Sequence, residues 1–251
     1  IGTGDWSSDV CSSDLMFSDN LDYPSIDEDA LLAAVLPRLA ATGNRQLVQV
    51  GANEGKFEYA KPDGKDFIFE FLQDNSDWRA ILIEPIPDIF DKLVENYRDH
   101  SNQIFYLNCA VTEGVETRDL MVVGRDGKSS TLIEGFRDDR AKDKIRVNCL
   151  PLRMACDLCN MQAPAFLKVD AERYDEIIVE QLFTQFDPQD RPALVLWEQM
   201  PRETRGLSKR FLEYGYTVFR TRQNTRRRWM NLVAVKSAFL PFVFIRANPR
   251  P

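Results

Sequence analysis

The fold is decided by the stretch Leu47-Val48-Gln49-Val50-Gly51-Ala52-Asn53-Glu54-Gly55. Its apolar half is typical of a buried strand, and a G-x-N-x-G turn follows. Gly51 and Gly55 can adopt backbone angles closed to other residues and let a ligand approach the main chain. Such a turn after the first strand of an open α/β sheet lies at the edge where these sheets bind ligands. A plain strand-to-loop turn gives the same pattern.

Apolar, β-branched runs alternate with helical patterns along the rest of the chain. Near-continuous apolar runs are typical of parallel strands covered on both faces, and the alternation predicts a doubly wound α/β sheet. The last two strands should form a closing hairpin at the sheet edge. The expected strands are 46–51, 80–84, 104–111, 165–170, 193–198, 215–221 and 230–236, and the expected helices are 30–41, 68–75, 87–97, 175–183 and 202–214.

Three regions are expected within the 251 residues. Residues 1–15 contain a near-repeat with little to bury, typical of a non-native or disordered leader. Residues 16–251 should form a single domain. Within it, residues 117–152 break into short alternating pieces around a Gly/Ser/Asp-rich stretch, which predicts an inserted region with extra strands that could cover a site.

The overall charge is acidic, with 32 Lys and Arg against 39 Asp and Glu, a net charge of −7. This balance argues against a nucleic acid or an anionic membrane surface as the main partner. The basic run at 225–228 is either a solvated turn or a phosphate contact. Because the sequence has no 18-residue apolar window and no secretory pattern, we expect a cytoplasmic protein.

Cysteine and histidine are sparse. Five cysteines do not suggest a disulfide framework in a chain of this length. Cys156-x-x-Cys159 has no second pair and the chain has one histidine, so a closed zinc site lacks ligands. We therefore expect buried thiols and no metal. His100 follows the helix expected over 87–97 and should lie away from the ligand edge.

An acid stands at the tip of the second strand, in Ile81-Leu82-Ile83-Glu84-Pro85. A carboxylate there can accept both hydroxyls of a nucleotide ribose. Glu84 follows Gly51 by 33 residues, more than the ~20 of a dinucleotide fingerprint, and there is no G-x-G-x-x-G. A solvated strand-end Glu is the alternative.

Two further acids end a later strand, in Phe166-Leu167-Lys168-Val169-Asp170-Ala171-Glu172. Asp170 and Glu172 would project at the same sheet edge as Gly51 and Glu84. Paired carboxylates there can hold a cationic group or act as a base. The alternative is an Asp that caps the next helix, with an acid in its first turn.

Taken in order, these motifs resemble the FkbM-type methyltransferases, a family of class I enzymes dependent on S-adenosyl-L-methionine. The resemblance spans roughly residues 47–236 and includes Asn108-Cys109-Ala110-Val111. It implies a Rossmann-like seven-stranded sheet, mostly parallel with an antiparallel last strand and with helices on both faces. It also implies cofactor-binding roles: Gly51, Asn53 and Gly55 at the methionine end, Glu84 at the ribose, and Asn108, Cys109 and Ala110 beside the adenine.

Two positions depart from the family pattern. Gln49 stands where an acid is usual, and Arg173 stands where a Gly normally follows the acid at 172. A neutral Gln weakens an ammonium contact, and Arg173 brings a bulky cation to a position of close approach. Both departures put cofactor affinity, or the type of acceptor, in doubt.

The resemblance implies methyl transfer, which depends mainly on holding the acceptor and the methyl group in line. A hydroxyl is a poor nucleophile and benefits from a base, for which Asp170 and Glu172 are the candidates, followed by Glu198. We therefore expect O-methylation of a small molecule or saccharide. The alternatives are a degenerate ligand- or partner-binding domain and an NAD-dependent oxidoreductase, which the 33-residue spacing disfavours.

Overall fold

The computed structural model describes residues 23–55, 67–101, 103–123, 130–133, 141–199, 206–221 and 230–241. The leader expected over 1–15 and the basic run at 225–228 lie outside the described residues.

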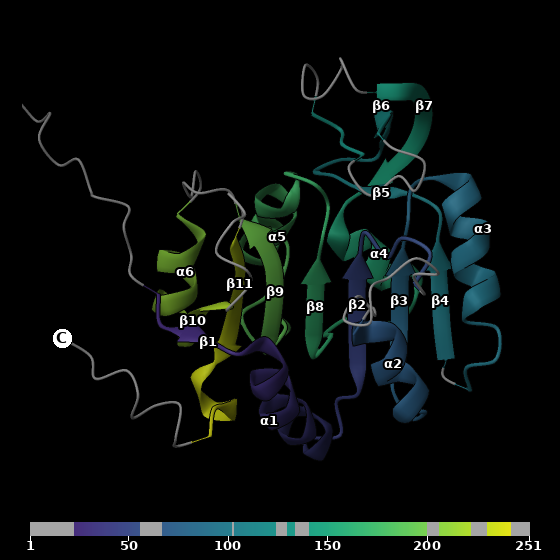
Figure 1. Ribbon diagram of the computed structural model, residues 1–251. Coiled ribbons are helices and arrows are strands. Elements are labelled where there is room, and N and C mark those ends of the chain that lie inside the picture. Colours follow the sequence, from purple (N-terminus) through teal and green to yellow (C-terminus); the bar gives the residue numbers. More distant parts are fainter. Residues whose placement is uncertain are drawn as a thin grey trace, which may run out of the picture.

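The centre of the molecule is one large sheet (Figure 1). Seven of its eight strands run in the same direction, and β11 runs antiparallel to both of its neighbours. This confirms the predicted mostly parallel sheet with an antiparallel last strand. The spatial order is β1 (Ser25–Ile26), β10 (Tyr216–Thr221), β11 (Met230–Lys236), β9 (Leu194–Gln199), β8 (Phe166–Val169), β2 (Gln46–Val50), β3 (Arg79–Ile83) and β4 (Gln103–Leu107).

Helices cover both faces, because successive strand residues point to opposite sides. On β2, Val48 and Val50 enter one core, and Leu47 enters the other. The first core is closed by α4 (Leu152–Leu158), α5 (Asp175–Thr184) and α6 (Leu207–Glu213). The second is closed by α1 (Glu28–Ala41), α2 (Phe67–Asp74) and α3 (Pro87–Asn96).

Four of the five expected helices begin within two residues of where the sequence places them, whereas α6 begins at Leu207 and residues 202–205 of its expected range lie outside the described residues. α1 starts after Asp27, whose side chain accepts a hydrogen bond from the amide of Ala30 at 2.9 Å, as expected of an N-cap. The seven-residue α4 was not predicted, because it begins at the last residue of the region interpreted as an insertion. A short 3₁₀ helix, Ser237–Phe239, follows β11. Within the described residues, no helix is both long and apolar enough to span a bilayer.

The strand expected over 104–111 is in fact two strands in two sheets. β4 ends at Leu107, and β5 (Ala110–Val111) joins a second sheet with β7 (Ala141–Leu150) and β6 (Glu116–Val123). The break is fixed by Asn108, whose side-chain amide donates to the carbonyls of Glu84 at 2.9 Å and Pro85 at 3.2 Å. The second sheet stands beyond the carboxyl ends of the main strands (Figure 1).

The predicted hairpin of β10 and β11 is present, but it does not close the sheet as expected. β11 lies between β9 and β10, and the two-residue β1 pairs outside β10 as an eighth strand, one more than the seven expected. Residues 232–235 of β11 are all fully buried. This near-continuous apolar run is more typical of an interior strand, which is covered on both faces and paired on both edges, than of an edge strand.

Candidate active site

A pocket of about 460 Å³ opens at the carboxyl ends of the parallel strands. This volume lies within the ~300–1,000 Å³ range of small-molecule sites. The lining includes five acids and one lysine: Glu28, Glu84, Asp170, Glu172, Glu198 and Lys168. The pocket therefore brings together the strand-tip acids that the sequence predicts to meet at one edge.

The glycine turn has the predicted backbone form, and its glycines are also closely packed. Gly51 and Gly55 have φ angles of +74° and +73°. A Cβ on Gly51 would lie 1.9 Å from the carbonyl oxygen of Asp170, and one on Gly55 would lie 2.3 Å from the Tyr97 ring. Packing within the protein therefore requires glycine at both positions, and their role toward a ligand stays a prediction. Gly51 lines the pocket, whereas Gly55 does not.

Glu84 connects the turns that follow β2 and β3. Its side chain is buried, with one oxygen accepting from the amide of Asn53 at 3.0 Å and the other from the amide of Ile86 at 2.9 Å. Burial raises the pKa of Glu84 to about 7, and the charge of Asp170 adds to this, while the two amides oppose it. Glu84 is therefore not the solvated strand-end acid of the alternative interpretation.

The segment expected beside an adenine divides in two. Cys109 and Ala110 are buried and line the pocket. Asn108 does not line the pocket. Its side chain instead bonds to the Glu84 carbonyl at the break between β4 and β5. Burial raises the pKa of Cys109 to about 12, so this side chain presents a neutral thiol.

The two predicted catalytic acids both line the pocket. Asp170 is exposed, and Glu172 and Arg173 have φ angles of +46° and +80°, a conformation that non-glycine residues rarely adopt. The hydroxyl of Thr131 donates to the carbonyl of Glu172 at 2.9 Å and helps to hold the turn. Helix α5 begins after Tyr174 without a side-chain cap, so neither acid has the capping role of the alternative.

Asp175 is a buried acid that the sequence predicts only as the first residue of a helix. Its two oxygens accept from the amides of Ala171 at 3.2 Å and Arg173 at 3.1 Å. Burial raises its pKa to about 8, with further contributions from the charges of Asp170 and Glu198. An acid in the first turn of a helix is common, so Asp175 carries no sequence signal for this buried role.

The raised pKa values predict how stability depends on pH. Glu84 and Asp175, with pKa values of about 7 and 8, keep protons in the folded state that the unfolded chain has released. Unfolding therefore releases protons, and stability should fall as pH rises from 6 to 8.5. Thermal unfolding of the ligand-free protein should show a falling melting temperature over this range, with a smaller fall in Asp175→Asn. A melting temperature that stays level or rises in the wild type would contradict these protonation states.

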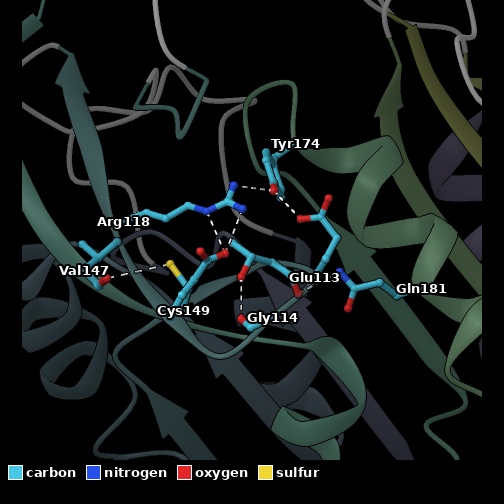
Figure 2. Close-up of polar contacts among 9 residues, drawn as sticks. Glu113, Gly114, Arg118, Val147, Cys149, Tyr174 and Gln181 are labelled. Atoms are coloured by element: carbon cyan, nitrogen blue, oxygen red, sulfur yellow. Dashed lines mark hydrogen bonds and ion pairs between the residues drawn. The ribbon is translucent and has the colours of Figure 1, made fainter.

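The second sheet is tied to the pocket wall by a polar network (Figure 2). The Tyr174 hydroxyl donates to Glu113, and Arg118 on β6 donates to the same hydroxyl at 2.8 Å. Gln181 on α5 adds a second link by donating to the carbonyl of Thr112 at 3.1 Å. Because Tyr174 lines the pocket together with Leu120, Thr131 and Leu132, the region predicted as an insertion forms one wall of the site.

Three further residues that the sequence singled out, His100, Gln49 and Arg173, lie outside the pocket lining. His100 packs against the rings of Phe69 and Tyr97, with Nε2 3.2 Å from the carbonyl of Phe69. Gln49 is fully buried within β2, and neither it nor Arg173 lines the pocket. The four described cysteines are free, buried thiols.

No family model and no curated protein matches this sequence. Among solved structures, the METTL16 methyltransferase domain is 11% identical, covers 84% of this chain and 66% of that chain, and has a TM-score of 0.45. Fibrillarin from Aeropyrum pernix, solved with natively bound S-adenosyl-L-methionine, is 14% identical (81% and 74% covered, TM-score 0.39). A methyltransferase from Pyrococcus furiosus is 10% identical (80% and 81% covered, TM-score 0.38). These similarities concern the fold, and the FkbM resemblance stays a prediction.

Proposed function

We propose that the protein is an S-adenosyl-L-methionine-dependent methyltransferase that methylates a hydroxyl of a small molecule or saccharide. The observation that carries this proposal is the buried carboxylate of Glu84, which touches the G-x-N-x-G turn and lines the pocket. Each carboxylate oxygen has two acceptor sites, so the amides of Asn53 and Ile86 leave capacity for two hydroxyls of a ribose.

The rest of the pocket suits the other parts of this cofactor. Ile86, Cys109 and Ala110 offer an apolar surface beside Glu84, suited to a flat adenine ring. The excess of acids over lysine in the lining favours a ligand of net positive charge, and the cofactor has an ammonium and a sulfonium group against one carboxylate. When bound, this cofactor supplies an activated methyl group.

Asp170 is the proposed base, and Glu172 is the second candidate. Asp170 lies beside the Gly51 turn, lines the pocket and is exposed enough to meet an acceptor hydroxyl. A carboxylate there can take up the hydroxyl proton as the oxygen becomes a nucleophile. Glu198, at the end of β9, also lines the pocket and ranks third.

The degenerate binding domain is the weaker alternative. That alternative rests on Gln49 and Arg173, which depart from the FkbM pattern. Neither residue lines the pocket, so these two departures do not alter the pocket wall. The acidic lining also disfavours the phosphates of a nucleic acid or of NAD. The cytoplasmic location remains a prediction.

Replacing Glu84 tests the proposed cofactor site. Glu84→Gln should weaken binding of S-adenosylhomocysteine about 10- to 100-fold, because charge-assisted hydrogen bonds worth ~1.5–3 kcal/mol are lost. Isothermal titration calorimetry gives the dissociation constant, with Glu95→Gln on the exposed side of α3 as the matched control. An unchanged dissociation constant in a folded Glu84→Gln protein would refute the ribose role.

A further inference from the structure

The pocket contains a second polar region that the proposed cofactor site does not use. It is formed by Glu28, Lys168, Glu198 and Asn231, all of which line the pocket. They come from the start of α1 and from β8, β9 and β11. We refer to these four residues as the α1-side cluster.

The sheet register explains why these distant residues meet. Lys168 is the partner of Leu196 on β9, and Glu198 follows two residues later on the same face. Glu198 is in turn the partner of Asn231 on β11. Leu196 belongs to the core that packs against α1, so this face of the sheet looks toward the helix that begins with Glu28.

Glu28 shows that the protein does not supply all the hydrogen bonds that this polar cluster can form. Burial raises the pKa of Glu28, whereas the charge of Lys168 and the side chains of Thr221 and Asn231 lower it. Its second carboxylate oxygen, Oε2, is buried and meets no hydrogen-bond donor among the described residues. A buried acceptor without a donor is costly, so a hydroxyl supplied by a ligand would complete the cluster.

The chemistry of the cluster indicates the class of ligand. Glu28 and Glu198 can only accept hydrogen bonds when ionised, Lys168 can only donate, and the Asn231 amide can do both. A hydroxyl both donates and accepts, so neighbouring hydroxyls on one ring can pair with acceptors and donors in turn. The five acids against one lysine in the lining disfavour a phosphate or carboxylate on the ligand.

We propose that the α1-side cluster is the acceptor subsite and that it binds an uncharged, polyhydroxylated ring such as a neutral sugar unit. This inference rests on the proposed methyltransferase function. It narrows that function, because it excludes acceptors that carry their own anionic group close to the methylated hydroxyl.

The test uses the full chain saturated with S-adenosylhomocysteine and saturation-transfer difference NMR. The probes are the methyl glycosides of glucose, galactose, mannose and rhamnose, with glucose 6-phosphate and glucuronate as anionic counterparts. At least one neutral glycoside should give signals in the wild type that exceed those of both anionic sugars. Lys168→Met and Asn231→Ala should each reduce these signals several-fold, while the S-adenosylhomocysteine dissociation constant changes by less than about two-fold.

Lys209→Met is the matched control, since Lys209 is exposed on α6 and does not line the pocket. Two variants are used so that a folding defect in one, seen as a lowered melting temperature, does not decide the result. The subsite would be overturned if no neutral glycoside bound, if an anionic sugar bound better, or if both folded variants kept wild-type signals. Failure of S-adenosylhomocysteine itself to bind would instead overturn the proposed function.

Discussion

Asp170→Asn should lower kcat about 100- to 10,000-fold, the range expected when a general base is removed. Asp170 follows β8, is exposed, and lines the pocket. An Asn of nearly the same size keeps the local shape and the polar contacts of the side chain, but it cannot take up a proton at neutral pH. The assay follows formation of S-adenosylhomocysteine with any acceptor that the wild type methylates.

Binding measurements separate a catalytic role from a binding role for Asp170. The dissociation constant of S-adenosylhomocysteine should stay within about two-fold of wild type. The Asp170 charge also raises the pKa of Glu84, so the variant should retain S-adenosylhomocysteine binding to a lower pH. Asp91→Asn provides the control, because it makes the same substitution at an exposed residue of α3. Equal losses in kcat and affinity would make Asp170 a binding residue and move the base to Glu172 or Glu198.

Gly51→Ala should destabilise the fold by about 2 to 5 kcal/mol, the sum of a left-handed backbone angle and an overpacked contact. The added methyl carbon would lie 1.9 Å from the Asp170 carbonyl oxygen. Neither strand can move away easily, because the Gly51 amide donates to the carbonyl of Ile83 and the Asp170 amide donates to the carbonyl of Val50, both at 3.0 Å. Urea unfolding measures the loss.

Gly43→Ala isolates the contribution of the contact. Gly43 has a similar φ angle of +84°, but a Cβ there would have no atom within 4 Å. This control should lose only the backbone contribution of about 1 to 2 kcal/mol. If both variants lost the same stability, the close approach of the β2 and β8 ends would be refuted.

The sheet was predictable because its strands are buried on both faces. Apolar runs such as residues 80–83 and 193–197 indicate burial on both faces, and they can be seen directly in the sequence. The split of the expected strand 104–111 at Asn108 was not predictable. It depends on hydrogen bonds from the Asn108 side chain to Glu84 and Pro85, which are more than 20 residues away in the sequence. The interior position of β11 is also a matter of long-range pairing.

The same distinction applies to the site. Glu84, Asp170 and Glu172 were found because parallel strands end at one edge, so an acid at a strand tip is informative. Glu28 and Asn231 come from near the two ends of the described chain and carry no local motif. Only the pairing of β11 with β9 and the packing of α1 bring them to the pocket.

Calorimetric titration of the full chain with S-adenosylhomocysteine tests the central claim most directly, with NAD⁺ as the control ligand. We predict saturable binding of one S-adenosylhomocysteine per chain and no heat of binding with NAD⁺. Ligand at 100 times its dissociation constant should add ~2.7 kcal/mol and raise the melting temperature by roughly 5 to 10 °C. Binding of NAD⁺ alone, or of neither ligand, would contradict the assignment of this pocket to the methyl-donor cofactor.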